Sequence, residues 1–246
     1  MAEKKRNAED ALAHIKGGKG RAVAVNLDKF EGLNNEVAQQ LIAGGSGKYV
    51  AGNLDKFEGL DHTEVALALI EAGNGKALAS NLGSFEGLDH VEIAEQLIAV
   101  GLGWCVAANL DNFEGLDHAE VARGVIAAGN GRTVARNLGS FVGLDHVEVA
   151  RDLMAAGNVD VVVAYLDRFE PLSHTEIAEA LIEAGEGGVV AENLGSFFEE
   201  ILCEEPDALL VARLFERETV TKEEFQGLLQ AARSVSSHEG GPRAVG

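Results

Sequence analysis

The sequence predicts an all-α protein: an α-solenoid, or superhelical array, of about seven helix-turn-helix repeats of about 28 residues, with a helical C-terminal cap. Thirty glycines stand against three prolines and 5% aromatic residues. Glycine therefore marks regular turns in a chain that is neither collagen-like nor poor in apolar residues. Phenylalanine sets the period, with one interval of 27 residues and five of 28, at Phe30, Phe57, Phe85, Phe113, Phe141, Phe169 and Phe197.

The first helix of each repeat is predicted from residues 61–73. Asp61 is followed three residues later by Glu64, which is the spacing of a capping box, so the helix should begin at His62. Apolar side chains then recur at helical spacing, and Gly73 ends the helix.

The second helix is predicted to start near Lys76 and to bury Leu78, Leu82 and Phe85 on one face. Gly87 then turns the chain into the next repeat. Helices this short are marginal alone, so we expect neighbouring repeats to stabilise one another by stacking.

The ends of the chain depart from the repeat. Residues 207–218 form an amphipathic pattern, and Thr221 with Glu224 has capping-box spacing before a helix over 225–232. The predicted organisation is a degenerate first repeat at 1–32, six repeats of 27–28 residues at 33–197, a helical cap at 198–235 and a disordered tail at 236–246.

Charge and cysteine content narrow the function classes. The net charge is −20, with +3 in residues 1–30 and −23 in residues 31–246, and an acidic surface disfavours nucleic-acid binding. No apolar run approaches a membrane span, and no secretory signal is visible. Two cysteines cannot supply a disulfide framework. We expect a cytoplasmic protein with no membrane contact and no cofactor.

The recurring Gly-x-Gly turns, such as Gly73-Asn74-Gly75, raise the question of a phosphate site. They lack the remaining residues of nucleotide-binding loops, and the left-handed turn that ends a helix explains the glycines without a ligand. No catalytic constellation stands out either, so we expect the protein not to be an enzyme.

Histidine recurs at the first helical position, at His62, His90, His118, His146 and His174. Stacked helices lie about 10 Å apart, which is too far for the rings to share a metal ion. We expect each ring to pack between repeats and to hydrogen-bond a neighbouring Glu or carbonyl group.

Asparagine recurs in the second helix at Asn26, Asn53, Asn81, Asn109, Asn137 and Asn193, with Tyr165 as the exception. Two interpretations remain open. The amides could bind the backbone of an extended peptide, or they could satisfy polar groups inside the array.

The candidate binding residues are those that depart from the repeat pattern. Leu102 and the chain's only tryptophan, Trp104, stand in a turn where other repeats carry polar and basic residues. If exposed, they would be a partner-binding or self-association hot spot, helped by Lys76 and Arg132 of the flanking repeats. Tyr165 marks a second departure.

One family resemblance follows from Leu60, Val65, Gly73, Ala77 and Leu78, which match the pattern of TAL-effector-like DNA-binding repeats without gaps. The first six repeats resemble that family at such positions. The resemblance implies a superhelix that wraps duplex DNA and reads one base per repeat, through Glu71–Ala72, Ala99–Val100, Ala127–Ala128, Ala155–Ala156 and Glu183–Ala184. These side chains offer few groups that can read base edges.

The sequence therefore predicts a non-enzymatic scaffold that binds a protein or peptide along one face of the array, with modular DNA binding as the alternative.

Overall fold

The computed structural model describes residues 5–169, 173–198 and 219–238. Over these ranges the chain is mostly helical and repeats a helix-turn-helix pattern, which confirms the all-α prediction. The chain divides into two compact units, Met1–Thr133 and Val134–Gly246, which we describe separately.

In the first unit, each repeat holds a first helix, here called the A helix, and a shorter second helix, the B helix. The A helices are α1 (Ala8–His14), α3 (Asn35–Leu41), α5 (His62–Glu71), α7 (His90–Ala99) and α9 (His118–Val125). The B helices are α2 (Gly20–Ala24), α4 (Gly47–Ala51), α6 (Gly75–Ser80), α8 (Gly103–Ala107) and α10 (Gly131–Arg136), the last of which runs into the second unit. Three of the turns between them, at Ile15–Lys19, Ile42–Ser46 and Ile126–Asn130, kink sharply at a glycine with positive φ: Gly18, Gly45 and Gly129.

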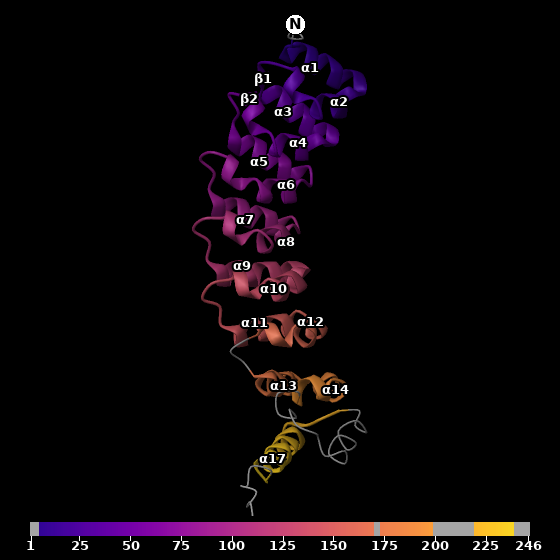
Figure 1. The fold of residues 1–246 in the computed structure, drawn as a ribbon, viewed down its shortest axis with the longest axis vertical. Coiled ribbons are helices and arrows are strands. Elements are labelled where there is room, and N and C mark those ends of the chain that lie inside the picture. Colours follow the sequence, from indigo (N-terminus) through magenta and orange to yellow (C-terminus); the bar gives the residue numbers. More distant parts are fainter. Residues whose placement is uncertain (1–4, 170–172, 199–218, 239–246) are drawn as a thin grey trace, which may run out of the picture. The chain divides into compact units, whose positions relative to one another are not determined.

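The A helices of the first unit lie side by side in one layer, and α4, α6 and α8 lie side by side in a second (Figure 1). The phenylalanines that set the period are buried between the layers, with Phe30, Phe57, Phe85 and Phe113 each at most 7% exposed. Stacking of adjacent repeats therefore buries the apolar side chains that each short helix cannot bury alone.

Helix α5 begins as predicted, but through half of the predicted capping box, whereas α1 and α13 begin with the complete box. The Asp61 carboxylate accepts a hydrogen bond from the Glu64 backbone N–H at 2.9 Å. The Glu64 carboxylate does not return to Asp61, because it accepts a bond from Asn35 Nδ2 of the preceding repeat at 2.6 Å. The reciprocal box does form at Thr221 and Glu224, as predicted.

The B helices are shorter than predicted. Helix α6 ends at Ser80, a 3₁₀ turn follows at Leu82–Ser84, and Phe85 is extended. Equivalent 3₁₀ turns lie at Leu27–Lys29, Leu54–Lys56 and Leu110–Asn112. The predicted face is still buried, with Leu78 and Leu82 at 0% and Phe85 at 6% exposure. The 3₁₀ turn keeps these side chains inward while it redirects the chain.

The two glycines of each Gly-x-Gly turn serve different purposes. Gly73 has φ +70°, a left-handed conformation that ends α5. Gly75 has an ordinary φ, but a methyl group there would lie 2.6 Å from Leu97 Cδ2 and 2.8 Å from Leu102 Cδ1. The second glycine therefore allows the next repeat to approach closely, which the sequence pattern did not reveal.

The links between repeats add a small parallel ladder that we did not predict. Strand β1 (Leu33–Asn34) pairs in parallel with β2 (Phe57–Glu58), and Arg6 bridges to Phe30 in the same way. These pairs satisfy backbone groups of links that follow neighbouring B helices.

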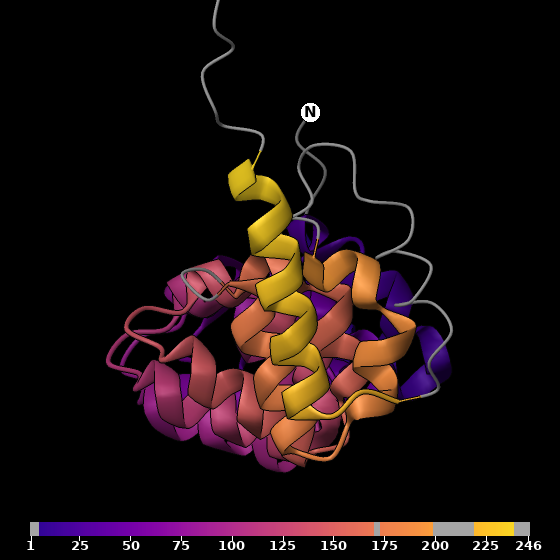
Figure 2. The same ribbon diagram turned by 90° about the horizontal axis from the view of Figure 1, so that it is seen from below.

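The second unit contains the end of α10, then α11 (His146–Ala155), α12 (Val159–Ala164), α13 (His174–Glu183), α14 (Gly187–Glu192) and α15 (Leu194–Phe198). Its 3₁₀ turns are Leu138–Ser140 and Leu166–Arg168. Helix α13 packs against both α11 and α17 (Lys222–His238), and Figure 2 shows α17 lying across the end of this unit.

Helix α17 provides the described part of the predicted cap. The Val220 N–H donates to the Gly187 carbonyl at 3.1 Å, and Phe225 is fully buried. The helix continues to His238, so residues 236–238 are helical and the expectation of a disordered tail is wrong for them. No glycine or proline lies between Gly227 and Gly240, and extending a formed helix costs little. The predicted helix at 207–218 and residues 239–246 lie outside the described residues.

Candidate functional site

Leu102 and Trp104 are not exposed in the way the sequence suggested. Both side chains are half-buried, and Trp104 belongs to helix α8 rather than to a loop. Leu102 lies on Gly75 of the preceding repeat, just as Asn74 lies on Gly47. The residue between the two glycines of a turn therefore packs on the preceding repeat. Leucine can replace asparagine at this position because it packs against apolar atoms.

The other predicted contributors come from three different repeats. Lys76 and Arg132 are exposed near the starts of α6 and α10. Tyr165 is half-buried after α12 in the second unit, where it precedes a 3₁₀ turn. The Lys76 ammonium acts on the thiol of Cys105, which follows Trp104 in α8.

The asparagine ladder caps the B helices. The Nδ2 group of each residue donates to the carbonyl four positions earlier, at 2.8–2.9 Å, in Asn26, Asn53, Asn81, Asn109 and Asn193. Asn137, the sixth residue predicted for the ladder, also ends a B helix, since it follows Arg136 of α10. The carbonyls at a helix end need such donors. The contacts favour the interpretation in which the amides satisfy groups inside the array.

Several of the recurring histidines bind backbone groups near the end of their own repeat. His62 Nδ1 accepts from the Glu86 N–H at 2.6 Å, and His90 Nδ1 accepts from the Glu114 N–H at 2.9 Å. The His90 ring also meets the Phe113 ring edge-on, with centroids 6.2 Å apart. In the second unit, His174 Nδ1 donates to the Ser196 carbonyl at 3.0 Å. The expected packing role is present, with backbone groups as partners.

Cys105 is buried in α8. Burial raises the pKa of its thiol to about 11, against the opposing influence of the nearby Lys76 ammonium. A protonated, enclosed thiol is a poor nucleophile and a poor metal ligand.

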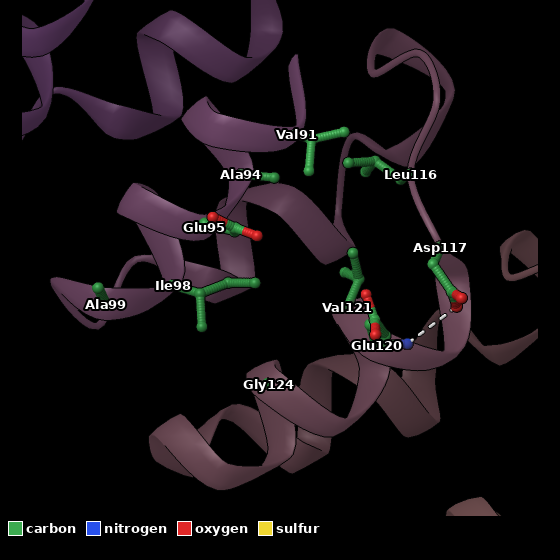
Figure 3. Close-up of a pocket in the computed structure, with 10 residues that line it drawn as sticks. All are labelled: Val91, Ala94, Glu95, Ile98, Ala99, Leu116, Asp117, Glu120, Val121 and Gly124. Carbon is green, nitrogen blue, oxygen red and sulfur yellow. Dashed lines mark hydrogen bonds between the residues drawn. The ribbon is translucent and has the colours of Figure 1, made fainter. Parts of the chain in front are cut away.

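An apolar groove lies between helices α7 and α9 of the first unit (Figure 3). Its volume is about 270 Å³. Helix α7 contributes Val91, Ala94, Glu95, Ile98 and Ala99, whereas the start of α9 and the loop before it contribute Leu116, Asp117, Glu120, Val121 and Gly124. Val91 is 39% exposed, so the groove opens to solvent at a large apolar side chain.

The groove results from substitutions within the repeat. At the places taken by Gly124 and Val121 in α9, helix α7 carries the larger Gln96 and Ile93. Because Gly124 has no side chain, Ile98 faces only the backbone of α9 at this place. A methyl group added to Gly124 would lie 3.5 Å from Ile98 Cγ2. Sequence comparison between repeats could have identified Gly124, but only the packing of α7 on α9 shows that its missing side chain opens a groove.

The segment that the sequence singled out lies directly behind this groove. A methyl group on Gly103 would lie 3.3 Å from Ile98 Cγ1 and 3.2 Å from Val125 Cγ2. Val100, which ends α7, is 55% exposed. The repeat with the unusual turn is thus also the repeat that forms one wall of the groove.

The rim of the groove is acidic. Glu95 stands on α7, and Asp117 and Glu120 stand at the start of α9, with both glutamates exposed. Asp117 is partly engaged, because its carboxylate accepts from the Ala119 N–H at 2.9 Å and from the Glu120 N–H at 3.1 Å, the second of which Figure 3 shows. No lysine or arginine is among the residues that line the groove.

Comparisons with known proteins find no matching family model, no matching curated protein and no matching solved structure. Among the described residues, no cluster of three or more His, Cys, Asp or Glu side chains is arranged to hold a metal ion. No helix in the described ranges is both long and apolar enough to cross a membrane.

Proposed function

We propose that this protein is a non-enzymatic, cytoplasmic scaffold whose repeats form an α-solenoid and whose α7–α9 groove binds a protein or peptide partner. The observation that carries the proposal is the groove itself. It is apolar, open at Val91, and present because one repeat has Gly124 where its neighbour has Gln96. An open apolar surface with a polar rim is typical of protein interaction sites.

The size of the groove favours a side-chain anchor over a small molecule. Ligand pockets usually measure about 300–1,000 Å³ and enclose most of the ligand. The groove is smaller, at about 270 Å³, and lies open between two helices. A single large apolar side chain from a partner fits such a space, and anchors of this kind supply much of the energy of protein interfaces.

The residue types that catalysis or cofactor binding would use have structural roles here. Asp61, Asp89 and Asp117 accept hydrogen bonds from the first turns of their helices. The repeated histidines and asparagines bind backbone groups, and Cys105 is enclosed and protonated. These contacts support a scaffold rather than an enzyme.

A differential peptide selection tests the proposal. A peptide library displayed on phage is selected against the wild-type protein and counter-selected against Gly124→Gln, which introduces the side chain that α7 carries at the equivalent place. We expect enriched peptides to bind the purified wild type at least tenfold more tightly than the variant. Peptides that bind both proteins equally would exclude the groove as the binding site.

A gel shift with mixed duplex and single-stranded nucleic acid, at low and moderate salt, separates this proposal from the DNA-binding alternative. We expect no retained nucleic acid, because the chain carries a net charge of −20. Tight binding that falls steeply with salt would replace the scaffold by a nucleic-acid-binding protein.

A further inference from the structure

We infer that the partner of the α7–α9 groove is a cationic amphipathic peptide segment, which inserts an apolar side chain between Val91, Ile98 and Gly124 and places lysine or arginine residues over the rim. This inference rests on the proposed function and adds the chemistry of the partner.

The arrangement of charge selects this partner over other apolar segments. Carboxylates stand on both sides of the groove, Glu95 on α7 and Asp117 and Glu120 on α9, while the lining between them is apolar. A segment with acidic residues beside its anchor would meet like charges on either side. A segment with basic residues meets complementary charge on both, which speeds association and excludes wrong partners.

The shape of the groove places the anchor. Val91, Ala94 and Ile98 follow one another along one face of α7, and Gly124 lies opposite on α9 (Figure 3). Because Gly124 has no side chain, the space beside Ile98 is open to an apolar group from outside. In the neighbouring helix pair the corresponding place holds Gln96, so the same docking is not available there.

Three fluorescein-labelled peptides of 14 residues, titrated by fluorescence anisotropy, serve as probes. The first is a helix-forming peptide of leucine and lysine. The second replaces each lysine by glutamate, and the third replaces each leucine by serine. The protein variants are Gly124→Gln, which fills the groove, and Ala68→Gln, which introduces the same side chain at the equivalent position of α5 and serves as the matched control.

We expect the leucine–lysine peptide to bind the wild type and Ala68→Gln equally, and Gly124→Gln at least tenfold more weakly. Both variants keep the net charge, so general attraction to an acidic protein cannot produce this difference. The double variant Glu95→Gln, Glu120→Gln should weaken binding at least fivefold and flatten its dependence on salt. The other two peptides should bind at least tenfold more weakly than the first.

The outcomes separate the two proposals. If the leucine–glutamate peptide binds as well as the leucine–lysine peptide and remains sensitive to Gly124→Gln, the groove is a binding site but the cationic partner is wrong. If no peptide responds to Gly124→Gln while circular dichroism shows that variant folded, the groove is not a binding site and both proposals fail.

Discussion

At the scale of single residues, polar side chains in this protein mostly complete the backbone. His90 accepts a hydrogen bond from the Glu114 N–H in the link that ends its repeat, and Asn109 donates to the Cys105 carbonyl. Short helices leave many terminal groups unpaired, because the first four N–H groups and last four carbonyls have no partner inside the helix. In the described repeats an Asp, Asn or Ser side chain caps the start of the A helix, and an Asn side chain caps the end of several B helices.

Cys105 supplies a test at this scale. The pKa of its thiol is raised by burial to about 11. The folded protein thus keeps the thiol protonated, with only about one molecule in a thousand as thiolate at pH 8. In a Cys203→Ser background, we expect no reaction with a thiol reagent at pH 8 until the protein is unfolded in urea, when one thiol reacts. Rapid labelling of the folded protein would contradict the enclosed position of Cys105.

The raised pKa of the Cys105 thiol also makes the stability of the folded protein depend on pH. The unfolded chain loses this proton near the ordinary pKa of 9.0, whereas the folded protein keeps it up to about 11. The stabilising contribution is therefore complete below about pH 9 and is lost as pH rises from there through about 11.

At the scale of helices and turns, glycine decides how closely repeats stack. Gly75 and Gly124 both stand in helices, but their surroundings differ. A methyl group on Gly75 would lie 2.6 Å from Leu97 Cδ2, whereas one on Gly124 would lie 3.5 Å from its nearest neighbour, Ile98 Cγ2. The first position has no room for a side chain, and the second has ordinary contact distance.

The two positions should therefore respond in opposite ways to alanine. We expect Gly75→Ala to lower the free energy of unfolding by about 1–3 kcal/mol, because the new methyl group forces neighbouring side chains apart. Gly124→Ala should raise it by about 0.5–1 kcal/mol, because alanine favours the helix. Urea unfolding, followed by circular dichroism, measures both. Equal effects of the two substitutions would show that the repeats do not approach closely at Gly75.

At the scale of the whole molecule, the repeats pack chiefly on their neighbours within each unit. Helix α5 contacts α3 and α7, and α7 contacts α5 and α9. A protein built in this way should tolerate the loss of whole repeats, provided that the remaining ones still meet in the same register.

Deletion of residues 85–140, two repeats taken in phase, tests this. We expect a folded, shorter protein whose helix content per residue is unchanged, since the repeats on either side present equivalent surfaces. Circular dichroism and small-angle scattering would detect the result. The control removes 14 residues fewer, which leaves the remaining repeats out of phase. This control should unfold. Loss of helicity well beyond the removed segment in the in-phase variant would indicate a closed core instead of a repeat array.

The sequence by itself determined the features that depend on neighbours along the chain. The 28-residue period, the helix start at His62 and the left-handed turn at Gly73 all follow from local rules of capping and backbone conformation. The helical character of the chain could be predicted for the same reason.

Tertiary structure alone decided the features that depend on residues one repeat apart. Glu64 leaves its capping box for Asn35, Leu102 lies on Gly75, and Gly124 opens a groove beside Ile98. Each of these contacts joins residues that are 26 to 29 positions apart in the sequence. Local sequence patterns predict where a helix begins and ends. The space between two helices depends on the side chains of both helices, and the candidate site lies in such a space.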